Sequence, residues 1–287
     1  MEIVSSVKDF QFLLSEGRNS GKEIGFVPTM GALHEGHTSL IDTSVKQKKS
    51  TAVSIFINPL QFSAEEDLDN YPSSLEKDEE ICINHKVDIL FCPTQKEIYP
   101  NGPPEPEEIG EIGTILEGKS RPSHFPGVAT VVARLFEIVG KSCAYFGEKD
   151  FQQVKVVNDL VKRRQFPVEI VACPTIRQVD GLALSSRNAY LTQDELTDAS
   201  VLYRALTVGA ESILNGEKNS ENLKKLISDV VKSESKGDLD YVGIVDSETF
   251  TPLNLLNDFG EQVRILIACK FGNARLIDNI GVVVPET

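Results

Sequence analysis

The chain has 287 residues, enough for one large domain or two unequal ones, and its 40% hydrophobic and 25% charged residues are ordinary for a globular protein. Its net charge of −14 argues against a nucleic-acid partner but leaves room for a small basic pocket that binds an anionic ligand. No apolar run approaches the roughly 20 residues that span a bilayer, and no secretory signal is visible, so we expect a cytoplasmic protein without a membrane partner.

Short apolar runs alternate with helical patterns through the first part of the chain. Each run is apolar on both faces, which is typical of parallel strands covered by helices on both sides. The predicted strands are 25–29, 52–58, 87–92, 143–147 and 168–173. The predicted helices are 36–49, about 73–86, 127–140 and 150–165, and an irregular Pro- and Glu-rich stretch covers 100–112.

The pattern changes after Pro174. Two helical segments, 192–214 and about 220–233, precede β-like runs at 240–246, 264–272 and 274–284. Helices followed by a small antiparallel sheet indicate a second domain. We therefore predict an α/β protein with a Rossmann-like parallel sheet in an N-terminal domain, 1–175, and a smaller α+β C-terminal domain, 176–287.

The five cysteines are scattered and include no C-x-x-C pair: Cys82, Cys92, Cys143, Cys173 and Cys269. An odd number of unclustered cysteines argues against a disulfide framework or a thiolate zinc site, so reduced thiols are expected.

Residues 113–120, Gly-Thr-Ile-Leu-Glu-Gly-Lys-Ser, formally match the phosphate-binding loop pattern G-x-x-x-x-G-K-[ST]. The context argues against that interpretation. No buried strand precedes the segment, Pro122 and Pro126 argue against a helix directly after it, and Glu117 would place a carboxylate beside the phosphates. Arg121 and His124 follow this segment, and the sequence assigns them no role.

His34 and His37 account for half of the four histidines and lie between a predicted strand and a predicted helix. Ligands bind at the carboxyl ends of parallel strands, where the first amides of a helix attract phosphate. Both imidazoles could donate to phosphate oxygens there, and Gly36 would let a nucleotide approach the backbone. The same spacing could hold zinc, although no third ligand is evident, or His34 could be an ordinary first-turn residue.

Three further polar clusters follow predicted strands or begin the second domain. Asn58 and Gln61 follow the second strand, and Lys149-Asp150 follows the fourth. Taken singly, Lys149-Asp150 could be a surface turn and the segment Leu184–Arg187 a flexible loop or helix cap. Together the clusters indicate one polar, cationic site at the sheet edge.

Five segments resemble a known family. They are PTMGALHEGHTSLI, SIFINPLQF, HFPGVATVV, YFGEKDFQQ and SSRNAYL, in this order along nearly the whole chain. The chain therefore resembles the pantothenate synthetases (pantoate–β-alanine ligases), which are nucleotidyltransferases with an H-x-G-H signature related to class I aminoacyl-tRNA synthetases. His34-Glu35-Gly36-His37 matches that signature.

The resemblance implies a reaction in which ATP and pantoate give pantoyl adenylate and pyrophosphate, and β-alanine then displaces AMP to give pantothenate. It implies Mg²⁺ on the ATP phosphates, with no protein ligand assigned, and a homodimer. It also implies three catalytic residues, His34, His37 and Lys149, with His37 as the general acid. Pantoate contacts are implied at Asn58, Gln61 and Gln153, with Gln61 also near β-alanine. ATP contacts are implied at Met30, Gly31, Ala32, Leu33, His34, Glu35, Gly36, His37, Gly147, Glu148, Lys149, Asp150, Ile176, Leu184, Ser185, Ser186 and Arg187.

Other functions remain open at this stage. Another adenylyltransferase with the same signature would leave the nucleotide in its product. A tRNA synthetase fits this acidic chain less well, and a silent nucleotide-binding regulator could dispense with Lys149 or the glutamines, which are all present.

Overall fold

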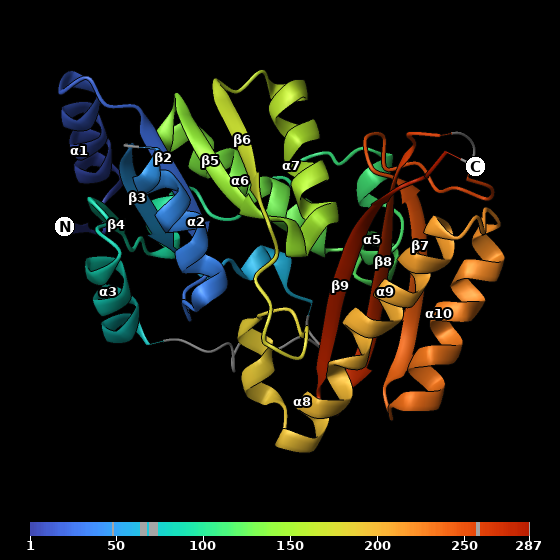
Figure 1. Ribbon diagram of the computed structural model, residues 1–287. Coiled ribbons are helices and arrows are strands. Elements are labelled where there is room, and N and C mark those ends of the chain that lie inside the picture. The colour runs from blue at the N-terminus through green and yellow to red at the C-terminus, as the bar shows by residue number, and fades with distance from the viewer. Residues whose placement is uncertain (48, 64–67, 69–73, 257–258, 287) are drawn as a thin grey trace. The chain divides into compact units, whose positions relative to one another are not determined.

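The computed structural model describes residues 1–47, 49–63, 68, 74–256 and 259–286 and divides into two compact units, Met1–Pro174 and Thr175–Thr287. Among these residues, six strands form a fully parallel sheet in the first unit, in the order β1-β4-β3-β2-β5-β6. The strands are β1 Glu2–Val4, β2 Ile24–Thr29, β3 Ser50–Ile55, β4 Ile89–Phe91, β5 Ser142–Gly147 and β6 Val168–Cys173 (Figure 1).

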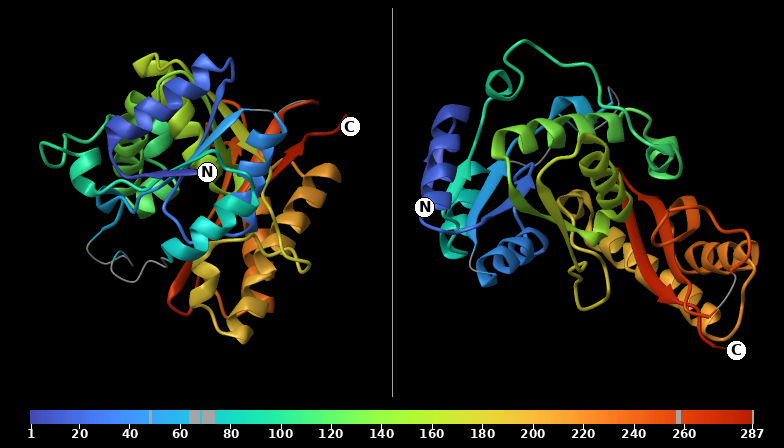
Figure 2. Two further views of the ribbon diagram at one scale, coloured as in Figure 1. Left: turned by 90° about the vertical axis from the view of Figure 1, so that its left-hand side faces the viewer. Right: turned by 90° about the horizontal axis from the view of Figure 1, so that it is seen from above.

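Helices cover both faces of this sheet (Figure 2). Alternate strand residues face opposite cores: Phe26 packs with residues of α1, α6 and α7, whereas Val27 packs with residues of α2 and α3. The helices and 3₁₀ turns of this unit are α1 Val7–Asn19, α2 Glu35–Lys46, η1 Pro59–Gln61, α3 Leu75–Asn84, α4 Gln95–Ile98, η3 Glu111–Gly113, α5 Glu117–Ser120, α6 His124–Val139, η4 Glu148–Asp150 and α7 Phe151–Arg164.

The second unit contains a three-stranded antiparallel sheet in the order β7-β8-β9. Its core is shared by apolar residues of the strands and of two helices, for example Leu206, Ile227 and Ile265. Its elements are η5 Ser186–Tyr190, α8 Gln193–Ala199, α9 Val201–Leu214, α10 Ser220–Glu234, β7 Asp238–Asp246, β8 Gln262–Phe271 and β9 Ala274–Val283 (Figure 1).

The predicted fold class, an α/β parallel sheet with a smaller α+β part, is confirmed. The sequence analysis missed β1 and α1, and it predicted one helix over 192–214 where the chain forms α8 and α9. Residue 48 of the predicted helix 36–49 and residue 73, at the start of the helix predicted over about 73–86, lie outside the described residues. Within the described residues, no helix combines the length and apolarity that crossing a membrane requires.

The prediction that two prolines oppose a helix directly after the phosphate-loop match holds at Pro122, which lies outside any helix, and is wrong at Pro126. Helix α6 begins at His124 and includes Pro126 as its third residue. The first amides of a helix have no intrahelical acceptor, so a proline there removes no helical hydrogen bond. The segment that matches the phosphate-loop pattern begins at the end of η3 and ends with the four-residue α5. Gln152 of α7 binds this region, because its Nε2 atom donates to the carbonyls of Ile112 (2.6 Å) and Ile115 (2.8 Å).

Candidate active site

The loop between β2 and α2 turns sharply at two left-handed residues. Gly31 has φ +85° and Ala32 has φ +52°, a conformation that costs little only for glycine. The buried carboxylate of Asp78 on α3 accepts hydrogen bonds from the amides of Ala32 (2.9 Å) and Leu33 (2.7 Å). Asp78 therefore holds the strained turn that leads to His34, a role that the sequence analysis missed.

His34 and His37 cap helix α2 through the same type of nitrogen. The Nδ1 atom of His34 accepts from the amide of Gly36 (3.1 Å), and the Nδ1 atom of His37 accepts from the amide of His34 (3.3 Å). An accepting Nδ1 requires the proton of a neutral imidazole to sit on Nε2. Both rings therefore carry an Nε2–H donor, and their centroids lie 4.2 Å apart.

Burial lowers the pKa of His34 to about 4 and the pKa of His37 to about 3. These values include smaller electrostatic effects: His34 lowers the pKa of His37, Lys149 lowers both pKa values, and the carboxylate of Asp150 opposes both shifts. Both imidazoles are therefore neutral at pH 7 without a ligand. The electrostatic effect of Lys149 and Asp150 on both rings also indicates that the end of β5 lies near the His34–His37 turn, as the sheet order predicts.

Strands β2 and β5 are neighbours, so the segments that follow them emerge at the same sheet edge. Gly147 ends β5, and Glu148, Lys149 and Asp150 form η4. The Nζ atom of Lys149 lies 3.4 Å from Oδ1 of Asp150. A cation partly screened from water beside two Nε2–H donors suits an anionic ligand.

A buried amide network follows β3. Asn58 donates from Nδ2 to Oε1 of Gln61 (3.2 Å) and accepts at Oδ1 from the hydroxyl of Tyr99 (3.0 Å). Gln61 in turn directs Nε2 at the sulfur of Met30 (3.0 Å), which belongs to the loop after β2. Asn58, Gln61 and Met30 are therefore brought together, and Tyr99 is a further member that no local motif indicated.

The closeness of α6 to η1 depends on a glycine. The Nδ2 atom of Asn58 also donates to the carbonyl of Gly127 on α6 (3.1 Å). A Cβ at Gly127 would lie 2.2 Å from the carbonyl oxygen of Leu60 and 2.5 Å from Cα of Gln61. Further along, Nδ1 of His124 lies 3.2 Å from the carbonyl oxygen of Gln61. The start of α6 therefore packs directly against the backbone of Gln61.

The adjacent glutamines of α7 have different surroundings. Gln152 is buried and bound to the segment around Ile115, whereas Gln153 is only half-buried in the first turn after η4. Gln153 therefore lies near the end of β5.

The remaining sequence-predicted residues lie in the second unit. Ile176 and Leu184 pair across a short hairpin, with the amide of Leu184 donating to the carbonyl of Ile176 (3.0 Å). Ser185 caps η5 by accepting from the amide of Arg187 (3.3 Å) at Oγ, and Ser186 is the first residue of that turn. These residues form one continuous loop.

A family model for pantoate–β-alanine ligase matches residues 2–281. The chain belongs to the pantoate–β-alanine ligase family. It is 45% identical over 284 residues to the pantothenate synthetase of Caldicellulosiruptor saccharolyticus, covering 99% of this chain and 100% of that one. With the pantothenate synthetase of Aquifex aeolicus it shares 46% identity over 279 residues, covering 96% and 97% of the two chains.

Solved structures of pantothenate synthetases have the same fold. The structure from Thermus thermophilus matches with a TM-score of 0.90 and 41% identity over 98% of this chain and 99% of that chain. A pantoate–β-alanine ligase from Francisella tularensis, solved with "Beta-gamma ATP" and β-alanine, matches with a TM-score of 0.77 and 40% identity over 98% and 97%. The fold and ligase class expected from the sequence motifs are therefore confirmed.

The part of this ligase that the structure describes has no group of three or more His, Cys, Asp or Glu side chains that could hold a metal ion. The zinc interpretation of His34 and His37 loses its support, because each Nδ1 accepts from a backbone amide, so the ring proton lies on Nε2 and neither nitrogen offers a lone pair to a metal. A magnesium ion that arrives on ATP needs few protein ligands, since it keeps phosphate oxygens and waters around it.

Proposed function

We propose that this ligase condenses pantoate with β-alanine through a pantoyl-adenylate intermediate. A pantoate carboxylate oxygen attacks the α-phosphorus of ATP and pyrophosphate leaves. The amine of β-alanine then attacks the acyl carbon, AMP leaves and the ammonium loses a proton. The observation that carries the proposal is the pair of Nε2–H donors on His34 and His37 at the start of α2, coupled electrostatically to Lys149.

The catalytic roles assigned here follow from these charges. His34, His37 and Lys149 would bind the phosphates and stabilise charge on the departing pyrophosphate. Because the pKa values of the ligand-free protein are about 4 and about 3, both imidazoles would meet ATP as neutral Nε2–H hydrogen-bond donors. The remaining work is alignment of the carboxylate with phosphorus.

The binding roles remain those implied by the family motifs. ATP, entering as its Mg²⁺ complex, would contact the loop Met30–His37, the turn Gly147–Asp150, Ile176 and the loop Leu184–Arg187. Its Mg²⁺ would keep phosphate oxygens and waters as most of its ligands. Pantoate would be held by Gln61, Gln153 and Asn58, and β-alanine would lie near Gln61. Neutral amides suit this task, since a lysine would pair with the attacking carboxylate and a glutamate would repel it.

The two units have separate proposed roles. Residues 1–175 would bind the nucleotide and pantoate, and residues 176–287 would close over ATP through the loop Leu184–Arg187. We also propose a cytoplasmic homodimer, consistent with five free thiols. Light scattering of the purified protein tests the dimer.

An isotope-exchange experiment tests the reaction order. With ATP, Mg²⁺ and pantoate, but without β-alanine, the enzyme should incorporate labelled pyrophosphate into ATP, because adenylation precedes amine attack. Adding β-alanine should give pantothenate and free AMP, both identifiable by mass spectrometry. Exchange that depends on β-alanine would contradict a preformed adenylate, and a product that retains the nucleotide would favour the alternative adenylyltransferase.

A further inference from the structure

The loop Leu184–Arg187 is the direct continuation of a short hairpin. Its two strands are joined by the bond from Leu184 to Ile176 and by the amide of Gln178, which donates to the carbonyl of Leu182 (2.8 Å). The turn closes where the amide of Gly181 donates to the carbonyl of Gln178 (3.0 Å). The position of this hairpin on the second unit therefore sets where the loop begins.

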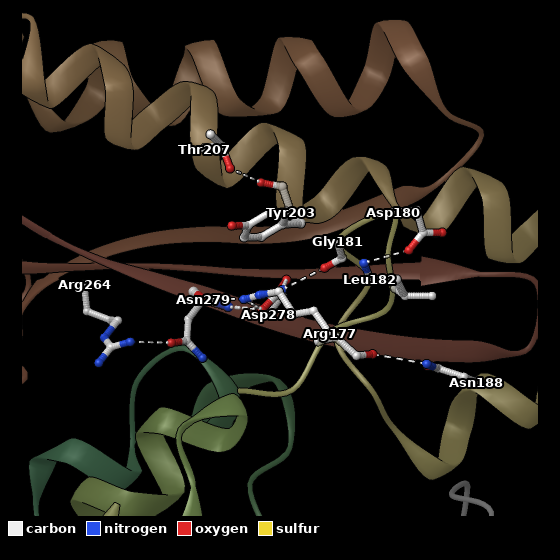
Figure 3. Close-up of polar contacts among 11 residues, drawn as sticks. Arg177, Asp180, Gly181, Leu182, Asn188, Tyr203, Thr207, Arg264, Asp278 and Asn279 are labelled. Atoms are coloured by element: carbon white, nitrogen blue, oxygen red, sulfur yellow. Dashed lines mark hydrogen bonds and ion pairs between the residues drawn. The ribbon is translucent and has the colours of Figure 1, made fainter. Parts of the chain in front are cut away.

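One guanidinium group attaches the hairpin to strand β9 (Figure 3). Arg177 donates from Nη1 to Oδ2 of Asp278 (2.6 Å) and from Nη2 to Oδ1 of Asp278 (2.8 Å). The same group donates from Nη1 to the carbonyl of Gly181 (3.0 Å) and from Nη2 to the carbonyl of Asn279 (3.2 Å). Arg177 thus binds both ends of its own hairpin turn to a strand that is about a hundred residues away in sequence.

The pair is withdrawn from water and packed against α9. The side chain of Asp278 is 2% exposed and that of Arg177 is 18% exposed. The guanidinium carbon lies 4.1 Å from the ring centroid of Tyr203, and a Cβ at Gly181 would lie 2.3 Å from Cδ1 of that ring. A bidentate, stacked and buried arginine has little freedom, so the hairpin has one defined position.

A hydrogen bond also fixes the loop relative to the hairpin. The side chain of Asn188 in η5 donates from Nδ2 to the carbonyl of Ala183, the residue just before Leu184 (3.1 Å, Figure 3). Ser185 caps η5 in between. A shift of the hairpin would therefore move Ser185, Ser186 and Arg187 together.

We infer that Arg177 and Asp278 are positioning residues that set ATP affinity by fixing the loop Leu184–Arg187. The inference rests on the proposed function, in which that loop binds ATP. Neither residue needs to touch the nucleotide: both terminal nitrogens of the guanidinium, Nη1 and Nη2, already donate to the carboxylate and to two backbone carbonyls. The loop carries the recognition, and the buried pair gives it a fixed starting point.

The first test is Asp278→Asn, which keeps the shape of the side chain and removes its charge. The Kd for ATP should rise, and kcat/KM for ATP should fall by about 10²-fold, the effect that a misplacement of about 1 Å can have on a rate. The Kd for pantoate should stay unchanged, because its proposed ligands lie in the first unit. Hydrogen exchange should accelerate at the amides of Gln178, Gly181 and Leu184, and not in the ladder between β7 and β8.

The chain offers a matched control in the same sheet. Arg275 donates from Nε (3.0 Å) and Nη2 (2.6 Å) to Oδ2 of Asp240 and lies over Tyr241, but this pair is more exposed and joins β9 to β7. Asp240→Asn should leave ATP binding unchanged. Equal losses in both variants would mean that any broken ion pair in this sheet weakens ATP binding, which overturns the inference.

A second variant separates positioning from loss of folding. Arg177→Met combined with Asp278→Leu replaces the buried pair with apolar side chains, a change that commonly preserves stability. The double variant should fold, retain pantoate affinity and still bind ATP weakly, since the bonds to Gly181 and Asn279 are lost. A folded double variant with normal ATP affinity overturns the inference.

Arg187→Ala distinguishes this inference from the proposed function. Weak ATP binding in Arg187→Ala together with normal binding in Asp278→Asn would overturn the positioning role alone. Normal ATP binding in Arg187→Ala would remove the loop from the ATP site, and the inference would fall with that assignment. Weak binding in both variants supports it.

Discussion

Lys149 is a cation whose charge is felt by both imidazoles of the α2 turn. It follows β5 directly, so its backbone is fixed by the central part of the sheet, and its side chain is only 20% exposed. A charge held in this way needs little reorganisation as negative charge shifts from the α-phosphate to pyrophosphate. Its contribution should therefore be larger in the transition state than in the complex with ATP.

Lys149→Ala should lower kcat by about 10²-fold or more, which is the usual loss for one transition-state donor. The Kd for ATP should change much less. Lys119→Ala is the control, because Lys119 is exposed on α5 and belongs to the sequence that resembles a phosphate loop. Steady-state kinetics and ATP titrations of both variants decide the matter: comparable losses at Lys119 would restore the phosphate-loop interpretation.

At the scale of elements, the close contact of α6 with η1 holds the amide network in place. Gly127 lets the helix approach the backbone of Leu60 and Gln61, and its carbonyl accepts from Asn58. The clashing atoms are backbone atoms, which cannot rotate away as the end of a flexible side chain can. A single methyl group here must therefore separate two elements.

Gly127→Ala should lower the free energy of unfolding by about 1–3 kcal/mol, the range for overpacked cores. It should also weaken the binding of pantoate more than the binding of ATP, because Gln61 moves with η1. Gly281→Ala is a suitable control, since a Cβ on this β9 residue would make an ordinary contact at 3.4 Å with Arg264. Urea unfolding and separate ligand titrations measure both effects. A Gly127→Ala protein with wild-type stability and pantoate affinity would show that α6 does not constrain η1.

The elements also show what the sequence could predict. Strands β2, β3, β5 and β6 were recognisable as short runs with apolar residues on both faces, and parallel order alone placed His34, Asn58 and Lys149 at one edge. Strand β1 has only three residues at the sheet edge, too short for a periodic signal. Asp78 lies in the acidic run Glu76–Glu80, where a surface role is the simplest interpretation. Its buried contacts come from a loop 45 residues away, and Tyr99 and Gly127 also act through distant partners.

At the scale of the whole molecule, the acidic chain has neutral imidazoles and a lysine in the loops that we propose bind the phosphates of ATP. The net charge is −14, whereas the α2 turn offers Nε2–H donors and Lys149 to an anion. Neutrality of the two histidines is maintained by burial, and burial is a property of the folded chain. The ligand-free protein should therefore lose stability at low pH, where the unfolded chain can protonate both histidines and the folded chain cannot.

The sign of that dependence follows from the two pKa values. In the unfolded chain a histidine titrates near its ordinary pKa of about 6.5, whereas folding lowers the pKa of His34 to about 4 and that of His37 to about 3. Below about pH 6.5 the unfolded state therefore binds more protons, and stability falls as pH decreases through this window. The stability that the two neutral histidines contribute is fully present above about pH 6.5 and is lost as the pH falls toward 3.

A double variant, His34→Asn with His37→Gln, keeps side-chain oxygen acceptors for the two amides and removes both titrations. Its unfolding free energy should fall less steeply from pH 7 to pH 5 than that of the wild type, by up to about 1.4 kcal/mol per pH unit for each proton no longer taken up. Urea unfolding of both proteins at each pH gives the difference, in which the other titrating groups cancel. Parallel pH profiles would show that the imidazoles are not held neutral by the fold. In that case His37 could carry the proton that a general acid needs, and its role in pyrophosphate departure would have to be revised.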